Sequence, residues 1–481
     1  MMKNLILVYP PKRSTNEYGI SISLALLYLA GAARDSGVCD NIRMFDFNTP
    51  AGVGKTIDDL ISEINSMPGK TVVGVNCLYF SLFPSVHEIT KRIKEKFPEV
   101  KIAVGGMHPT VFAREIINNC PEIDAVAIGE SDVDFPKLLR YLYEEDANLT
   151  EGMEGVCLRL GAETVIKPRT CYIQNLDDLP RPGYEFFDFS DYSVDTENWW
   201  NPDGIKISPV GLPLITSRSC PNRCSFCSVQ LVMGDKYRPR SAESVFEEIK
   251  YLYDVYGVNY FRIMDENFLL NRKHVIKICE MVIESGIKVY FNAMGGLSEK
   301  TLDEGVIYLM RRAGFIMLSM AVESGSDYIR NTIMGKNISR ERIINAFRLC
   351  RAAGIVTRTF FIIGMPEDTE ETLRETIELI NDIDATRIEI SPAIPMPGTK
   401  LFEQCVRDNL FLDGFNAAPL WTGEFGAALH LEAESDRNLE NFFIRPYNLS
   451  MERLAEIQME IQQIVKEKMK AWTEHLQKKD I

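Results

Sequence analysis

Short apolar runs alternate with longer amphipathic segments over about the first 145 residues. Apolar runs of this length predict buried strands, and the amphipathic segments between them predict helices. The expected strands are Leu5–Tyr9, Ile42–Phe45, Val72–Val75, Ile102–Val104 and Ala125–Ile128. The expected helices cover residues 21–36, 57–66, 85–97, 110–118 and 133–144. This alternation indicates an α/β domain over residues 1–145, with a doubly wound, Rossmann-like sheet.

The same alternation returns between residues 211 and 405. The expected strands are Leu212–Ser217, Tyr260–Met264, Lys288–Ala293, Ile316–Val322, Thr357–Ile363 and Arg387–Ser391. Helices of about 12–18 residues separate them, as parallel neighbouring strands require. Six units rather than eight predict a partial (β/α)6 barrel, and its active face should be formed by the carboxyl ends of the strands.

Residues 146–210 are interpreted as a connector. They contain a predicted hairpin, Gly155–Leu160 with Thr164–Ile166, followed by the proline-rich segment Asn175–Pro182. Trp199 and Trp200 lie nearby, and they either line a substrate pocket or pack one domain against the other.

Residues 406–481 are expected to form a C-terminal helical extension. Ser450 is positioned to cap a helix that runs to about Gln477, and this helix has one apolar face that should pack on the barrel edge. Residues 411–447 show no clear periodicity, although Trp421 and Phe425 are candidates for contact with a substrate.

Composition narrows the classes of function. Hydrophobic residues make up 46% of the 481 residues and charged residues 25%, which is typical of a soluble globular chain. The formal net charge is −15 without a dense basic block, so we expect neither nucleic acid nor an anionic membrane as the main partner. The apolar run near Met1 is too short for a signal peptide or a membrane span. The scattered cysteines outside one cluster suggest no disulfide framework, so a reducing cytoplasm is expected.

Three cysteines, Cys220, Cys224 and Cys227, follow the first predicted barrel strand with C-x3-C-x2-C spacing. Soft thiolates from one short loop suit a cubane iron–sulfur cluster, and three of them leave one iron open to a small molecule. The alternatives are a zinc knuckle and three unrelated thiols. Zinc would need a fourth nearby ligand, and the next cysteine is Cys279.

This cysteine spacing, with Phe226 before the last cysteine, resembles the signature of the radical SAM family. The resemblance implies a [4Fe–4S] cluster whose open iron binds S-adenosylmethionine. Further family-like segments follow successive predicted strands and imply contacts with the amino group, ribose, carboxylate and adenine of that cofactor. The residues that match these segments are Asp265, Glu266, Asn267, Glu323, Ser324, Gly364 and Pro397. Glu266 or Asp265 is expected to hold the methionine amino group, and each segment read alone also fits a helix cap or a turn.

The loops after the strands of the first domain resemble the cobalamin-binding domain that precedes many radical SAM cores. The candidate ligand loops are Pro10–Tyr18, Asn76–Pro84, Gly105–Thr110 and Gly129–Asp132. The resemblance implies that cobalamin contacts Pro10, Tyr79, Gly105, Gly106, His108, Pro109, Thr110, Gly129 and Glu130.

Two of these residues have a second interpretation. Tyr79 either faces the lower side of the corrin or packs beside Phe80 and Phe83, and His108 is either a corrin contact or a turn residue before proline. The loop Lys12–Glu17 lacks the histidine that ligates cobalt in cobalamin mutases. The resemblance therefore implies cobalt without a histidine ligand below it.

Together these resemblances imply a cobalamin-dependent radical SAM methyltransferase. It would transfer a methyl group from S-adenosylmethionine, by way of methylcobalamin, to an unactivated carbon of a small molecule or of a peptide or protein side chain. The alternatives are an enzyme for oxidative cyclisation, ring rearrangement or carbon–carbon coupling, and a corrinoid or redox sensor without catalysis. A flavodoxin-like or ferredoxin-like protein is the expected electron donor, and no residue is singled out as a catalytic acid or base.

Overall fold

In the computed structural model the chain forms two compact units. The structure describes residues 1–11, 22–49, 54–161, 163–194, 196, 203–296, 302–412, 420–423 and 442–477. The loop Lys12–Glu17 and the residues Trp199, Trp200 and Phe425 lie outside these ranges. Among the described residues, no helix is both long and apolar enough to cross a membrane.

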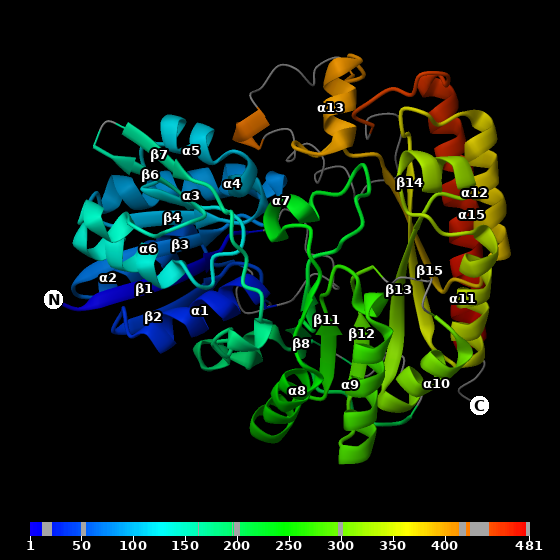
Figure 1. Cartoon of the computed structure of the whole chain (residues 1–481), viewed down its shortest axis with the longest axis horizontal. Coiled ribbons are helices and arrows are strands. Elements are labelled where there is room, and N and C mark those ends of the chain that lie inside the picture. Colours follow the sequence, from blue (N-terminus) through cyan, green and yellow to red (C-terminus); the bar gives the residue numbers. More distant parts are fainter. Residues whose placement is uncertain are drawn as a thin grey trace. The chain divides into compact units, whose positions relative to one another are not determined.

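The first unit is built on a parallel sheet (Figure 1). Its parallel strands are β1 (Lys3–Tyr9), β2 (Asn41–Asp46), β3 (Lys70–Asn76), β4 (Lys101–Gly105) and β5 (Ala125–Ala127). The order β2-β1-β3-β4-β5 is that of a flavodoxin-like sheet, which binds ligands at the switch point between β1 and β3. All five predicted strands and the predicted α/β class are therefore confirmed.

The helices of this unit cover the sheet because their apolar faces and the strands form one core. They are α1 (Leu24–Ser36), α2 (Ile57–Ser66), α3 (Phe83–Lys96), α4 (Met107–Val111), α5 (Ala113–Asn119) and α6 (Phe135–Glu144). The single helix predicted over 110–118 is instead divided into α4 and α5. Phe112 leaves the helical conformation (φ −113°, ψ 29°), and its ring packs against His108 at 5.0 Å between centroids.

The predicted hairpin belongs to this first sheet rather than to a free connector. Strand β6 (Val156–Leu160) pairs antiparallel with β5, and β7 (Glu163–Lys167) pairs antiparallel with β6. The first compact unit accordingly continues past residue 145 to residue 194. Of the later described residues it also includes 420–423 and 230–234, which are most of helix α7 (Val229–Met233).

The second unit contains a six-stranded parallel sheet in the described residues. Its strands are β8 (Gly211–Leu214), β11 (Tyr260–Ile263), β12 (Tyr290–Ala293), β13 (Phe315–Glu323), β14 (Val356–Ile363) and β15 (Arg387–Pro392). Each strand pairs with the next one along the chain, and β8 and β15 form the two edges. This is the open, partial (β/α)6 arrangement that the sequence predicts.

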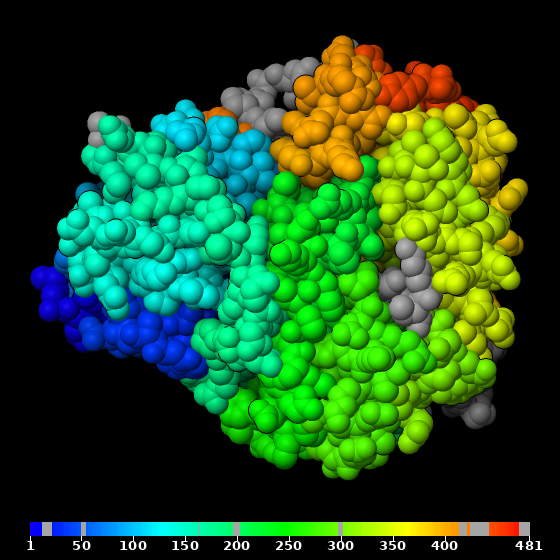
Figure 2. All heavy atoms as spheres, in the orientation of Figure 1, coloured from blue at the N-terminus to red at the C-terminus, as the bar shows by residue number. Residues whose placement is uncertain are grey.

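The helices of the second unit follow its strands in turn. They are α8 (Ala242–Tyr256), α9 (Arg272–Ser285), α10 (Glu304–Ala313), α11 (Arg340–Ala352), α12 (Glu370–Asp382), α13 (Lys400–Arg407) and α15 (Met451–Gln477). Helices α8 and α9 pack together and form a continuous surface at one edge of this unit (Figure 2). A short ribbon of β9 (Ser217–Arg218) and β10 (Arg238–Pro239) flanks the loop after β8.

Helix α15 confirms the predicted C-terminal helix. The Arg453 N–H donates to Ser450 Oγ at 3.2 Å, and the helix packs on α12 and β15 (Figure 1). Leu454, Ile457 and Ile461 are fully buried there. The apolar face of α15 therefore covers the edge of the barrel, as the sequence predicts.

Candidate functional site

The three cysteines lie in one loop at the carboxyl end of β8. Their side chains are half-buried, and the loop is fixed to its own unit by backbone hydrogen bonds. The Ser225 N–H donates to the Met334 carbonyl at 3.1 Å, and the Leu401 N–H donates to the Ser225 carbonyl at 2.9 Å. Just before the loop, Ser219 has a positive φ of 69°, a conformation that costs a residue with a side chain about 1–3 kcal/mol.

The thiols of the loop are neutral without a metal. Burial raises the pKa of Cys224 to about 11 and also raises the pKa of Cys227. These thiols therefore hold their protons at neutral pH until a metal ion replaces them. The sign of a missing group comes from Asn267: its Nδ2 lies 3.8 Å from Cys220 Sγ, and its buried Oδ1 has no hydrogen-bond partner. An unpaired buried oxygen beside the thiols fits a site that a cluster and its ligand complete.

The two neighbouring acids after β11 have different surroundings. Asp265 is fully buried and accepts hydrogen bonds from the Thr216 N–H at 2.7 Å and from the Thr216 and Ser217 hydroxyls at 2.6 Å each. Its carboxylate therefore holds the end of β8 in place. Glu266 accepts from the Ser219 N–H at 3.1 Å, at the entrance to the cysteine loop. Of the two sequence candidates for the amino group of S-adenosylmethionine, only Glu266 retains free acceptor capacity.

Replacing Glu266 by glutamine is expected to stabilise the ligand-free protein and to weaken its binding of S-adenosylmethionine. Burial raises the pKa of Glu266 from 4.5 to about 7, so the folded protein binds more protons than the unfolded chain between these values. Wild-type stability should therefore fall as pH rises from 4.5 to 7, by about 3 kcal/mol at most. In the variant this fall in stability with pH should be absent. Because the variant also lacks the charge-assisted contact, its Kd for S-adenosylmethionine should rise about 10–100-fold.

Urea unfolding at pH 5 and pH 8, together with calorimetric titration of S-adenosylmethionine, measures both effects. Asp265→Asn is the matched control, because it disturbs the hydrogen bonds from Thr216 and Ser217 and should lower the free energy of unfolding by about 1–3 kcal/mol. An unchanged affinity for S-adenosylmethionine in Glu266→Gln would contradict the assignment of Glu266.

The segment after β13 is held by a buried arginine. Glu323 has a positive φ of 68°, is buried, and lies 3.3 Å from the Nζ of Lys336. Arg330 is fully buried, and its guanidinium donates to the carbonyls of Ser324 at 2.7 Å and Ile338 at 3.0 Å. Met334 lies between these anchors and accepts from the cysteine loop, so Arg330 connects the Glu323 segment to that loop.

Two further predicted residues lie after β14 and β15. Gly364 has a φ of 82°, and its N–H donates to Asp368 Oδ2 at 2.8 Å. This N–H is already used inside the protein, so a contact between Gly364 and adenine would have to use another atom. Pro397 is buried in the turn that leads to α13, and Phe226 is half-buried within the cysteine loop.

In the first unit, Thr110 joins the two glycine loops at the carboxyl end of the sheet. The Gly129 N–H donates to Thr110 Oγ1 at 2.9 Å, and this hydroxyl donates to the Gly106 carbonyl at 2.7 Å. Gly106 has a φ of 120°, and a Cβ there would lie 2.3 Å from the Cys77 carbonyl oxygen. The ends of β3 and β4 therefore approach closely only because position 106 carries no side chain. Thr110 then joins the loops after β4 and β5.

Two other cobalamin candidates, Tyr79 and His108, differ in their exposure to solvent. Tyr79 is 46% exposed after β3, whereas its neighbours Phe80 and Phe83 are buried. His108 is fully buried: its Nε2 lies 2.8 Å from the Trp421 carbonyl oxygen, and burial lowers its pKa to about 4. The structure thus places Trp421 beside His108 in the first unit. Contact of Tyr79 or His108 with the corrin stays a prediction, as it does for Pro10, Gly105, Pro109 and Glu130. Contact of Trp421 with a substrate also stays a prediction.

The sequence did not single out Arg330 or Lys336. Both lie in a segment that carries no recognisable motif, and only the fold brings them to Glu323. An arginine flanked by Ile329 in an otherwise amphipathic stretch gives no signal of complete burial.

Two family models match the chain. The model described as the Radical SAM superfamily matches residues 214–380, and the one described as the B12 binding domain matches residues 15–139. The first range contains the cysteine loop and strands β11 to β14. The second contains the glycine loops that Thr110 joins.

The chain is also similar to named proteins. An uncharacterized methyltransferase of Pyrococcus horikoshii, PH0819, is 29% identical over 416 residues, 85% of this chain and 84% of that protein. An anaerobic magnesium-protoporphyrin IX monomethyl ester cyclase of Cereibacter sphaeroides is 27% identical over 387 residues, 80% of this chain and 60% of the cyclase.

A solved structure has a similar fold. It is the radical S-adenosylmethionine methyltransferase TsrM from Kitasatospora setae with cobalamin and a [4Fe–4S] cluster bound. It covers 97% of this chain and 89% of its own, with a TM-score of 0.71 and 18% identity. At this identity the likeness concerns the fold.

Proposed function

Because this chain belongs to the cobalamin-dependent radical SAM enzymes, we propose that it is a C-methyltransferase acting on a carbon that cannot itself act as a nucleophile. The supporting observation is that one chain joins a B12-binding sheet to a barrel with a three-cysteine loop. When bound, the cluster, S-adenosylmethionine and cobalamin would supply radical formation and a carrier for the methyl group.

The residues of the barrel would bind and orient S-adenosylmethionine. Cys220, Cys224 and Cys227 would hold the cluster, and Glu266 would accept from the ammonium group beside it. Glu323 suits the ribose hydroxyls, since a carboxylate can accept two of them, and Lys336 balances its charge. Asn267 has a free Oδ1 to offer to the same ligand.

The residues of the first unit would position the corrin. Gly106 and Gly129 leave room for close approach, Thr110 fixes the distance between their loops, and the exposed ring of Tyr79 offers an apolar face. We expect an external one-electron donor of the flavodoxin or ferredoxin type.

A second candidate is cyclisation or another radical rearrangement, because the relative from Cereibacter sphaeroides is named as a cyclase. The two are distinguished by incubating the cluster- and cobalamin-loaded protein with a reductant and methyl-labelled S-adenosylmethionine. Label on the bound cobalamin, together with formation of 5′-deoxyadenosine, supports methyl transfer. Release of 5′-deoxyadenosine while cobalamin stays unlabelled favours rearrangement, and a protein that cleaves no S-adenosylmethionine would be a sensor.

Methyl-labelled S-adenosylmethionine also tests whether the molecule that accepts the methyl group is large or small. We propose a peptide or protein side chain as the acceptor, with a small molecule as the alternative. After incubation with an extract of the source cells, label in acid-precipitable material supports the former, and label in the low-mass fraction supports the latter.

A further inference from the structure

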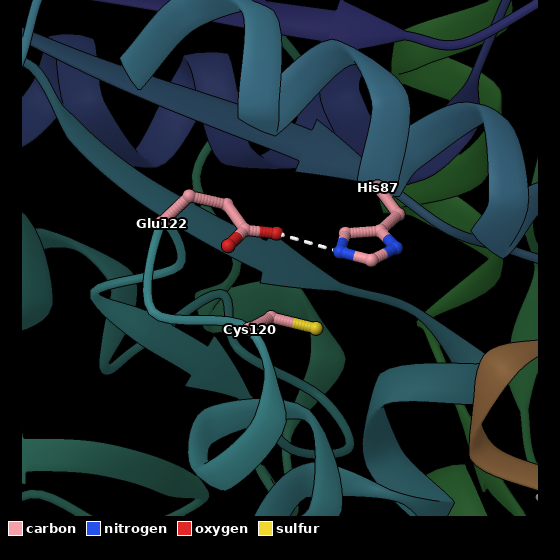
Figure 3. Close-up of side chains that lie close together, drawn as sticks. All are labelled: His87, Cys120 and Glu122. Carbon is pink, nitrogen blue, oxygen red and sulfur yellow. Dashed lines mark ion pairs between the residues drawn. The ribbon is translucent and has the colours of Figure 1, made fainter. Parts of the chain in front are cut away.

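Three side chains of different chemistry meet in the first unit, away from its glycine loops. His87 lies on α3, Cys120 ends α5, and Glu122 lies in the turn before β5. Their ligand atoms, one nitrogen, one sulfur and one oxygen, all lie within 4.8 Å of one another. Figure 3 shows the imidazole and carboxylate facing each other, with the sulfur of Cys120 directed toward the space beside them.

His87 and Glu122 are paired across the cluster. His87 Nε2 and Glu122 Oε1 are 2.9 Å apart. Burial raises the pKa of the Glu122 carboxyl, but the contact with His87 outweighs that effect and leaves the pKa below its usual value. The carboxylate is therefore ionised beside Cys120, and a metal ion bound here would take the place of the direct contact with the imidazole.

The three residues are held in place by their surroundings. The His87 ring stacks on Phe83 at 5.9 Å between centroids with an interplanar angle of 17°. The Cys120 N–H donates to the Ile116 carbonyl at 2.8 Å, and the Ile123 N–H donates to the Cys120 carbonyl at 3.1 Å. Arg159 donates to the Pro121 carbonyl at 3.1 Å, so the whole turn is fixed from both sides. Ligands held in this way lose little entropy on binding.

We propose that His87, Cys120 and Glu122 bind one divalent transition-metal ion, with zinc as the best match. Imidazole nitrogen, thiolate sulfur and carboxylate oxygen are the three ligand types that zinc takes in proteins. Tetrahedral zinc, with bonds of about 2.0–2.3 Å, holds its ligand atoms roughly 3.3–3.6 Å apart. The nitrogen and oxygen, now 2.9 Å apart, would separate slightly, and any pair near the 4.8 Å limit would draw in by roughly 1 Å, within the reach of side-chain rotation.

The fourth ligand would be water. Cys120 is fully buried and Glu122 nearly so, whereas the side chain of His87 is 27% exposed and leaves an opening to solvent. When the ion binds, the Cys120 thiol releases its proton to solvent, and thiolate and carboxylate together neutralise the metal charge. Without a metal, burial and the neighbouring Glu122 carboxylate raise the pKa of Cys120 to about 12, and the positive charges of Lys91 and Arg159 offset this only in part. The ion must therefore displace the thiol proton, so zinc affinity should rise with pH. The bound ion would join α3 to the turn that leads into β5.

The test uses the full chain with cluster and cobalamin already loaded, so that Cys220, Cys224 and Cys227 are occupied. After incubation with zinc and removal of free metal, we expect about one zinc per chain by elemental analysis, and a higher Tm with zinc than with a chelator. Zinc K-edge absorption should show one sulfur at about 2.3 Å beside lighter ligands at about 2.0–2.1 Å.

Variants at the site decide the assignment. His87→Gln changes a partly exposed side chain, and Glu122→Gln preserves shape, so both should fold while zinc affinity falls about 100-fold or more. Cys39→Ser, a half-buried cysteine of the same unit, is the control and should retain zinc. The proposal is overturned if wild-type protein retains no zinc, or if His87→Gln and Glu122→Gln retain as much as wild type.

Discussion

Replacing Cys224 by alanine is expected to remove the iron–sulfur cluster and with it the cleavage of S-adenosylmethionine. Cys224 is one of three thiols in a loop held by the Ser225 and Leu401 backbone, and the chain offers no fourth thiol in that loop to replace it. Loss of one ligand should lower 5′-deoxyadenosine formation by more than about 100-fold, since even the outer partners of metal ligands contribute 10–100-fold. Anaerobic iron and sulfide analysis, with chromatography of 5′-deoxyadenosine, measures both losses.

The matched control is Cys350→Ala in the same unit. Cys350 is fully buried in α11, so its truncation should reduce stability while the iron content stays that of wild type. If Cys224→Ala retained its cluster and its cleavage activity, the assignment of the cysteine loop would be wrong.

Replacing Gly106 by alanine is expected to abolish cobalamin retention while leaving S-adenosylmethionine cleavage in place. The new Cβ would lie 2.3 Å from the Cys77 carbonyl oxygen at a φ of 120°, so the end of β4 must move away from β3. That movement also displaces the Gly106 carbonyl that Thr110 binds. Strain of this kind costs about 1–3 kcal/mol, and the displaced loop should lose the corrin. Gel filtration followed by cobalt analysis and a 5′-deoxyadenosine assay provides the two readouts.

Gly37→Ala is the control that distinguishes backbone strain alone from a displaced cobalamin loop. Gly37 also has a positive φ, 59°, but a Cβ there would meet nothing within 4 Å. This variant should lose about 1 kcal/mol and still bind cobalamin. Cobalamin retained at wild-type level by Gly106→Ala would show that the loop after β4 does not hold the corrin.

The strands were predictable from the sequence because apolar runs of the right length are required to bury both faces of a parallel sheet. The hairpin was visible too, but its attachment to β5 was not. Backbone pairing between β5 and β6 leaves no pattern in the side chains. The division of the predicted 110–118 helix at Phe112 depends on the packing of that ring against His108, which is a tertiary contact.

The candidate site was predictable at the level of motifs and not of side-chain roles. The sequence places Asp265 and Glu266 in one loop. Only the structure shows that the Asp265 carboxylate already accepts hydrogen bonds from Thr216 and Ser217, which leaves Glu266 as the candidate for ligand binding. Arg330 carries a charge that suggests exposure, and the fold buries it completely beneath the Ser324 and Ile338 carbonyls. Such roles depend on contacts between residues distant along the chain.

Metal analysis of the anaerobically purified, reconstituted protein decides whether the cysteine loop holds an iron–sulfur cluster. We expect about four iron atoms and about four sulfides held by the loop of Cys220, Cys224 and Cys227, with one cobalt from cobalamin in the same chain. Zinc bound to those three cysteines in place of iron, with no iron–sulfur absorption, would contradict it.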